Sequence, residues 1–410
     1  MAYDLLDGRP EAVGLSAERL KRLDRRLADR WIGPGRIPGA LVLVHRRGRT
    51  VHLSVQGEAD RERGRPLAED TLFRIYSMTK PLVSLAFMML VEEGLVALDD
   101  PVSRFIPDWA ALSIYQSGES GGFVTIPPAR PMLMVDLLRH TSGLTYGIQV
   151  RTPVDAAYRA ADIGVLGAKI SLDQMIARLS GLPLEFSPGE AWNYSVSTDV
   201  VGYLIGQISG QPLEAFLQHR ILDPLGMAET GFDVPAAAAR RFAACYQATT
   251  EGLKLYDDPQ SSDYLRPPVF VSGGGGLVST AADYLRFCRM LLAGGELDGR
   301  RLVSPKTLEL MSANHLPGGR DLASMSRSLF SEATNEGVGF GLGFAVTLEP
   351  ARTLLPGSAG DIFWGGAAGT YFWVDPKEEL TVVFMTQALA GDNQRLRREL
   401  RTMVYSAFAD

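Results

Sequence analysis

Segments with the pattern of β-strands lie at both ends of this chain, and helical patterns fill the long interval between them. Near the N-terminus, residues 39–57 contain two apolar stretches on either side of a short polar turn, which predicts a hairpin. Further apolar stretches predict successive antiparallel strands at 339–349, 361–366, 370–376 and 380–388. One sheet that pairs the N-terminal hairpin with the C-terminal strands would accommodate all of these segments.

The helical patterns predict how such a sheet is covered. Residues 15–30 are amphipathic and follow Ser16, a favourable capping residue, and residues 391–408 form a second charged amphipathic segment. We expect these two terminal helices to cover the sheet. Further helices are predicted at 81–94, 132–139, 172–180, 197–209, 211–219 and 281–293.

The length of 410 residues favours two substructures, since one core rarely organises so long a chain. We expect an α/β (α+β) fold. Residues 1–79 and 330–410 would form an α/β sheet domain with an antiparallel sheet flanked by helices, and residues 80–329 a mainly helical domain. A ligand site is expected at their junction, where such sites are most often found.

Composition and charge exclude several classes of function. The chain is 46% hydrophobic and 21% charged, which is ordinary for a soluble globular protein, and its net charge of -6 gives no reason to expect nucleic acid or a membrane as partner. Two cysteines, Cys245 and Cys288, cannot form a disulfide framework. No secretory signal is visible, and the apolar run 81–91 is too short to span a bilayer. We therefore expect a cytoplasmic protein, with its oligomeric state open.

Ser77 and Lys80 are the first candidates for chemistry, because they lie three residues apart at the start of an apolar helical run. A serine needs a base to become a good nucleophile, and residues three apart share one helix face. The free N–H groups at a helix start also favour developing negative charge. Alternatively, Ser77 lies near a helix cap and Lys80 points to solvent.

Two other serine chemistries find little support. Gly118 to Gly122 match the G-x-S-x-G pattern with Ser120 as nucleophile, but no helix pattern follows, so we expect a surface loop. None of the five histidines supports a Ser-His-Asp triad, and His140 is expected to hold the turn after a helix. No HExxH, CxxC or His/Cys cluster occurs, so neither a metal nor another cofactor is expected.

Two later segments could complete a site around Ser77. Tyr194 lies just before a helical pattern, where it is either an anchor of the core or, next to a lysine, a general base. Gly365 and Gly366 follow Trp364 inside a predicted strand. Adjacent glycines there mark either a β-bulge or a close approach of ligand to the backbone.

The order and spacing of these three motifs resemble those of the family VIII carboxylesterases, which are related to class C β-lactamases and D-alanyl-D-alanine peptidases. The resemblance covers about residues 13 to 405. Four further stretches match as well: LLRHTSGL (137–144), FSPGEAWNYS (186–195), LGMAETGF (225–232) and SGGGGLVST (272–280). The resemblance implies a β-lactamase/transpeptidase-like fold and a serine hydrolase that forms an acyl-enzyme.

The resemblance also implies roles for individual residues. Ser77 would be the acylated nucleophile, and Lys80 and Tyr194 would share its proton, with the identity of the base left open. The backbone N–H groups of Ser77 and Ala367 would form the oxyanion hole.

Two departures from the penicillin-recognising relatives narrow the expected substrate. Those relatives carry K-T-G where this chain has Trp364 first, and Y-x-N where it has Val196, so two polar anchors for a peptide-like anionic ligand are missing. The residues expected to bind the substrate are Trp364, Gly365, Gly366, Tyr146 and Trp192. Such a site suits small neutral carboxylic esters. Acyl transfer to an alcohol, weak β-lactamase or D-amino peptidase activity, and a non-catalytic binding protein are the competing hypotheses.

Overall fold

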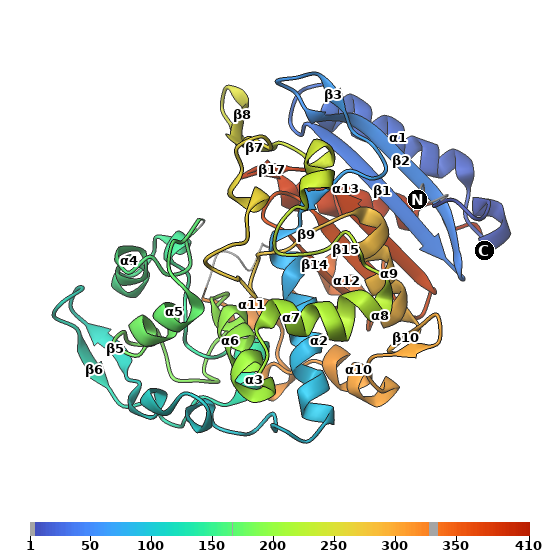
Figure 1. Cartoon of the computed structure of the whole chain (residues 1–410). Coiled ribbons are helices and arrows are strands. Elements are labelled where there is room, and N and C mark those ends of the chain that lie inside the picture. Colours follow the sequence, from blue (N-terminus) through green and yellow to red (C-terminus); the bar gives the residue numbers. More distant parts are fainter. Residues whose placement is uncertain (1–4, 166, 328–334) are drawn as a thin grey trace.

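A computed structural model describes residues 5–165, 167–327 and 335–410 of the chain. Its main feature is an antiparallel eight-stranded sheet in the order β12-β13-β14-β15-β16-β1-β2-β3 (Figure 1). The N-terminal hairpin joins the C-terminal strands through β1 and β16, where Leu43 lies opposite Val383. The strands are β1 Gly39–Arg46, β2 Arg49–Asp60, β3 Arg65–Pro66, β12 Val338–Phe340, β13 Ala345–Thr347, β14 Ile362–Gly365, β15 Tyr371–Asp375 and β16 Leu380–Met385.

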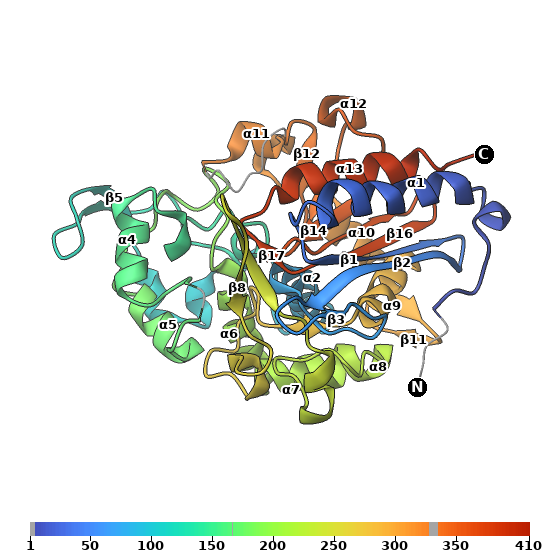
Figure 2. The same ribbon diagram turned by 90° about the horizontal axis from the view of Figure 1, so that it is seen from above.

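Helices cover both faces of this sheet. Helices α1 (Ala17–Leu27) and α13 (Asn393–Tyr405) run side by side along one face (Figure 2). Ser16 caps α1 by accepting a hydrogen bond from the Arg19 N–H. Alternate strand residues such as Val42 and Trp373 point into this layer, and their neighbours point to the opposite face, where α9 (Ala281–Leu292) packs. The expected fold class and the covering terminal helices are confirmed.

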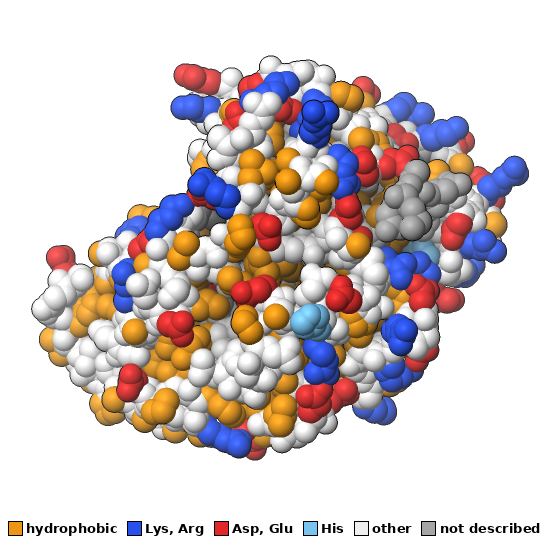
Figure 3. Space-filling model, viewed as in Figure 1, with side chains coloured by type: hydrophobic (Ala, Val, Ile, Leu, Met, Phe, Trp, Pro, Cys, Tyr) orange, Lys and Arg blue, Asp and Glu red, His pale blue; other side chains and the backbone are white. Residues whose placement is uncertain are grey.

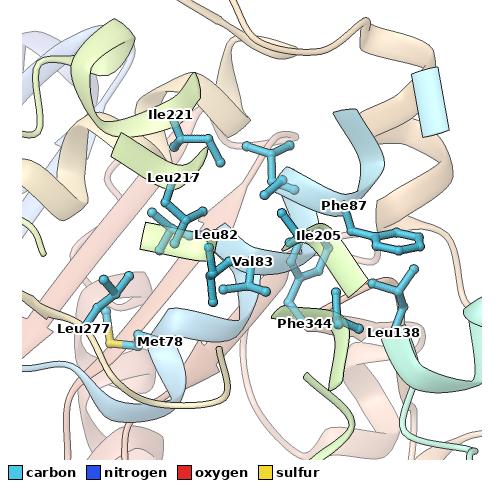
Figure 4. Close-up of a cluster of buried hydrophobic side chains, with 14 of the residues drawn as sticks. Met78, Leu82, Val83, Phe87, Leu138, Ile205, Leu217, Ile221, Leu277 and Phe344 are labelled. Atoms are coloured by element: carbon cyan, nitrogen blue, oxygen red, sulfur yellow. The ribbon is translucent and has the colours of Figure 1, made fainter. Parts of the chain in front are cut away.

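Helix α2 (Thr79–Glu92) begins directly behind Ser77 and lies in the largest hydrophobic core. Residues 79–90 of this helix are all buried, and apolar side chains occur on every side of it, as expected of a helix inside a core. Leu82, Val83 and Phe87 contact side chains from α3, α6 and α7 and the chain before β13 (Figure 4). Packing on all sides anchors the helix start that carries Ser77 and Lys80.

The remaining helices and small sheets lie outside the eight-stranded sheet. The other helices are α3 Met134–Leu138, α4 Pro153–Ala160, α5 Leu172–Leu179, α6 Ser197–Ser209, α7 Leu213–Leu217, α8 Asp223–Leu225, α10 Pro305–Ser312, α11 Leu322–Met325 and α12 Pro350–Thr353. Short sheets are formed by β4 Phe73–Arg74 with β9 Val278–Ser279, β5 Ile114–Ser117 with β6 Val124–Ile126, β10 Glu296–Leu297 with β11 Arg300–Arg301, and β7 Cys245–Thr249 with β8 Gly252–Asp257 and β17 Ala388–Leu389.

One predicted strand is wrong. Residues 339–349 form two short strands, β12 and β13, instead of one. The chain turns at Gly343, whose φ of 101° is a left-handed value that glycine adopts easily. A Cβ at Gly341 would also collide with the Met311 carbonyl oxygen. The division into domains at residues 79/80 and 329/330 stays a prediction; α9, inside 80–329, packs on the sheet.

Candidate active site

Ser77 lies in a tight turn that joins β4 to α2. A 3-10 turn, Tyr76–Met78, precedes the helix, and Tyr76 has a φ of 42°, a left-handed value that is unusual for a bulky residue. The buried Tyr76 ring holds this conformation, with its hydroxyl 3.9 Å from Cys245 Sγ. Strain of this kind persists where the surrounding packing determines the backbone, and here it leaves Ser77 partly exposed above a buried helix.

Lys80 points toward Ser77 and not toward solvent. Its side chain is fully buried, and Nζ lies 3.3 Å from Ser77 Oγ. The ammonium also donates to the Gly274 carbonyl oxygen at 2.6 Å and to the Tyr146 hydroxyl oxygen at 3.2 Å. A protonated lysine has three N–H donors, and each has an acceptor here.

The same arrangement also suits a neutral Lys80. A neutral amine keeps two N–H donors, which match the Gly274 carbonyl and the Tyr146 hydroxyl, and its lone pair is then directed at the Ser77 hydroxyl. Lys80 can therefore accept the serine proton and return it without moving its other partners. This is the geometry required of a base that acts on a serine nucleophile.

Asp199 supports Lys80 indirectly through the glycine-rich stretch 272–276. Its carboxylate accepts hydrogen bonds from the Ser272 hydroxyl at 2.6 Å and from the Gly274 N–H at 2.9 Å. Burial raises the pKa of Asp199, and the Lys80 charge opposes that shift. A Cβ at Gly274 would lie 2.6 Å from Asp199 Oδ2, so only glycine fits. Sequence reasoning missed Asp199 and the Gly274 carbonyl; the run of four glycines was the available signal.

Tyr146 contacts Lys80 and is not among the residues that line the cavity at Ser77, so its contact with substrate stays a prediction. Burial raises its pKa well above the ordinary value, and the Asp199 charge and Tyr194 raise it further. The Tyr146 phenol therefore keeps its proton at neutral pH and does not serve as a phenolate base. Its hydroxyl acts as a partner of Lys80.

Tyr194 lies between Lys80 and a cluster of aromatic rings. Lys80 Nζ is 4.5 Å from the centroid of the Tyr194 ring. The ring centroids of Trp364 and His140 lie 5.5 and 4.9 Å from that of Tyr194. His140 is fully buried, which lowers its pKa, and the nearby Lys80 charge lowers it further. A neutral imidazole thus packs against Tyr194, a contact that the sequence did not suggest.

The glycines of β14 allow its end to approach the Ser77 turn closely. A Cβ at Gly366 would lie 2.5 Å from the Ile75 carbonyl oxygen, so only glycine permits this distance between the strand and the turn. Ala367 follows and lines the same cavity as Ser77. The group that approaches Gly366 is the protein's own backbone at Ile75, and a close approach of ligand to the two glycines stays a prediction.

A cavity of about 640 Å³ opens at Ser77, and Tyr194, Trp192 and Trp364 to Ala367 line it. Its wall includes aromatic rings, since the ring centroids of Trp192 and Trp364 lie 6.1 and 5.5 Å from that of Tyr194. The basic side chains of Arg397, Arg398 and Arg401 line the cavity as well. Val196 does not line this cavity, because it is buried in the main core. Acidic and basic side chains are interspersed over the face in Figure 3, so no patch of a single charge marks it.

Several other expectations concern groups away from this cavity. Ser120 lies between β5 and β6 and no helix follows it, so the nucleophile elbow is absent. Within the described residues, no three His, Cys, Asp or Glu side chains gather as metal ligands would. In the same part of the chain, no helix has the length and hydrophobicity that a membrane span needs. Cys245 and Cys288 are buried free thiols.

Comparison with known proteins identifies the family. A sequence model of the family described as beta-lactamase matches residues 22–404. The chain belongs to the beta-lactamase family. Within this family, Protein Rv1367c of Mycobacterium tuberculosis is 38% identical over 356 residues, which cover 86% of each chain. Esterase EstB of Burkholderia gladioli is 34% identical over 418 residues, covering 97% of this chain and 98% of that protein.

A solved structure gives the same beta-lactamase fold. EstCE1, described as a hydrolase with promiscuous acyltransferase activity, superposes with a TM-score of 0.78 at 28% sequence identity. The superposition covers 95% of this chain and 99% of EstCE1.

Proposed function

We propose that this protein is a serine carboxylesterase of the family VIII type, which hydrolyses small neutral carboxylic esters through an acyl-enzyme on Ser77. The single observation that carries the proposal is the buried Lys80 Nζ, 3.3 Å from Ser77 Oγ, at a cavity walled by aromatic rings. EstB and EstCE1, whose names describe an esterase and a hydrolase, support it.

In the proposed reaction, Ser77 Oγ attacks the ester carbonyl carbon while its proton passes to Lys80 or Tyr194. The carbonyl oxygen becomes an oxyanion that accepts hydrogen bonds from the backbone N–H groups of Ser77 and Ala367. When the tetrahedral intermediate collapses, the C–O bond to the alcohol breaks and the alcohol leaves with the stored proton. Water then attacks the acyl-enzyme, gives its proton to the same base, and releases the carboxylic acid as that proton returns to Ser77 Oγ.

The preference for neutral esters rests on Trp364 and not on the cavity as a whole, which Arg397, Arg398 and Arg401 also line. Trp364 stands at the position where the penicillin-recognising relatives have a lysine, and the centroids of its ring and the Tyr194 ring are 5.5 Å apart. An indole offers apolar contact to an acyl chain and no positive charge to a carboxylate. The spaces beside Gly365 and Gly366 are filled by Arg397 and by the Ile75 carbonyl, so a substrate carbonyl would meet this strand at the Ala367 N–H.

Substitution of the nucleophile tests the proposal. Ser77→Ala should abolish hydrolysis of p-nitrophenyl butyrate while its thermal unfolding stays close to that of the wild type. Ser120→Ala is the matched control, because Ser120 is exposed in the β5–β6 loop, and it should retain full activity. A fluorophosphonate label followed by mass spectrometry should give one adduct, on Ser77. Undiminished turnover by Ser77→Ala, or an adduct on Ser120, would refute the proposal.

Acyl transfer to an alcohol is the second candidate, and the description of EstCE1 favours it over β-lactamase or D-amino peptidase activity. An alcohol that occupies the cavity can attack the acyl-enzyme in place of water. Product analysis with a competing alcohol separates the two reactions: an esterase yields mainly free acid, and a transferase mainly the new ester. Nitrocefin cleavage faster than ester hydrolysis would instead indicate a β-lactamase.

We further propose that the protein acts in the cytoplasm on a small-molecule ester, without nucleic acid as partner. The free thiols of Cys245 and Cys288 support a reducing compartment, and the net charge of -6 argues against polyanion binding. Fractionation of cells that express the full chain would test the location; recovery in the culture medium or the membrane pellet would contradict it.

A further inference from the structure

Arg397 lies beside the end of the strand that leads into Ala367, and it lines the same cavity as Ser77. It extends from α13, and its Nη2 donates to the Gly366 carbonyl oxygen at 2.7 Å and to the Thr370 carbonyl oxygen at 3.2 Å. The side chain is half-buried, and its guanidinium lies 5.4 Å from the centroid of the Tyr371 ring. A cation is therefore held directly against the end of the β14–β15 hairpin.

Gly365 provides the space that this cation occupies. A Cβ at residue 365 would lie 2.5 Å from Arg397 Nη2 and 2.6 Å from its Cζ. Any side chain there would displace the guanidinium. The two adjacent glycines therefore leave room on opposite faces of the strand. The space at Gly366 is occupied by the Ile75 carbonyl, and the space at Gly365 by Arg397.

The Gly366 carbonyl and the Ala367 N–H belong to one peptide group. We propose that Arg397 polarises this peptide and so strengthens the Ala367 N–H as an oxyanion-hole donor, which makes Arg397 a positioning residue for the esterase reaction. This inference rests on the proposed function. A charge-assisted hydrogen bond to a carbonyl draws electron density toward its oxygen and leaves the N–H of the same amide a stronger donor.

Two features match this role. In a trans peptide the C=O and N–H point in opposite directions, so Arg397 binds one side of the amide and leaves the other side for substrate. Asn393, one turn earlier on α13, donates from Nδ2 to the Ala367 carbonyl oxygen at 3.3 Å. The first turns of α13 thus hold the carbonyls on both sides of the Ala367 N–H.

The effect should appear in the transition state and not in substrate binding, because negative charge on the carbonyl oxygen develops only during the reaction. Removing an oxyanion-hole donor lowers kcat about 100- to 1,000-fold, and weakening one without removing it should have a smaller effect. For Arg397→Gln, which keeps an N–H donor but no charge, we expect kcat about tenfold lower with KM nearly unchanged. Arg397→Lys keeps the charge and should recover most of kcat.

The test measures p-nitrophenyl butyrate kinetics, the affinity for butylboronic acid, and thermal unfolding for both variants. Butylboronic acid forms an anionic tetrahedral adduct with a serine, so its affinity should fall by about the same factor as kcat in Arg397→Gln. Arg395→Gln is the control, since Arg395 is exposed on the same helix and pairs with Glu399. It should leave kcat and the boronic acid affinity unchanged.

The result would differ if Arg397 only stabilised the fold. It would lower the unfolding temperature while kcat and boronic acid affinity remained at the wild-type values, and that result would overturn the inference. Equal kcat for Arg397→Lys and Arg397→Gln, or a raised KM with unchanged kcat, would overturn it too. Wild-type turnover that depends on Ser77 establishes the esterase separately, so these outcomes do not touch the proposed function.

Discussion

Gly366→Ala tests whether the close approach of β14 to the Ser77 turn is required for catalysis. The added Cβ would lie 2.5 Å from the Ile75 carbonyl oxygen and in still closer contact with Thr370 Oγ1. An ordinary contact begins at 3.4 Å, so about 0.9 Å of displacement is needed. The threonine can rotate, but the Ile75 oxygen is backbone, and the strand itself has to move.

The size of the effect follows from where that movement occurs. Gly366 adjoins Ala367, so the shift moves the proposed Ala367 donor away from Ser77. A displacement of about 1 Å in an active site lowers the rate about 100-fold, and the loss of an oxyanion-hole donor has a similar effect. We expect kcat to fall about 100-fold, or about 2.7 kcal/mol of transition-state stabilisation. KM should change little, because ground-state contacts with the aromatic wall persist.

The assay compares kcat and KM for p-nitrophenyl butyrate with thermal unfolding. Gly122→Ala is the matched control, because a Cβ at that exposed glycine meets nothing within 4 Å. Thr370→Ala combined with Gly366→Ala removes the hydroxyl contact but not the Ile75 contact, so it should remain impaired. A Gly366→Ala variant with kcat within twofold of the wild type would refute the reasoning, as would full recovery in the double variant.

Two further predictions concern buried groups. Gly274→Ala places a Cβ 2.6 Å from Asp199 Oδ2 and should displace the Gly274 carbonyl that accepts a hydrogen bond from Lys80. We expect kcat to fall at least tenfold. Unchanged kcat in a folded variant would contradict this prediction. Burial raises the pKa of Asp283 from 3.8 to about 6, so the native state binds this proton more tightly than the unfolded state. The resulting stabilisation is present below about pH 4 and is lost as the pH rises through 6, a change of about 3 kcal/mol. Urea unfolding of the wild type and Asp283→Asn should show this change in the difference between their free energies of unfolding; a pH-independent difference would refute it.

Local patterns were sufficient to predict that Ser77 and Lys80, the proposed catalytic pair, lie together. Ser77 and Lys80 are three residues apart, and helix geometry alone brings such side chains to one face, as the 3.3 Å contact shows. The apolar run behind them predicted burial, and Lys80 is fully buried. The strand and helix periods likewise predicted the sheet and its covering helices α1 and α13.

Contacts between distant segments could not be predicted in this way. The Gly274 carbonyl lies 194 positions after Lys80, and no periodicity links the two. Arg397 appeared in the sequence as one of several charged residues of an amphipathic helix, a pattern that only predicts solvent contact. The left-handed Tyr76 and the turn at Gly343 are backbone conformations that depend on the packing around them.

The four consecutive residues Trp364 to Ala367 are constrained by different neighbours. These differences determine which of the four positions can change the substrate preference. Gly365 is constrained by Arg397 and Gly366 by Ile75, while Ala367 contributes its backbone N–H to the proposed oxyanion hole. Trp364 instead presents a large side chain to the cavity, where its ring packs against that of Tyr194. Because its side chain is separate from the peptide that would bind the oxyanion, position 364 can alter the acyl preference and leave the proposed chemistry intact. Substrate selection and transition-state stabilisation would thus be carried by neighbouring residues of one strand, one through a side chain and the other through the backbone.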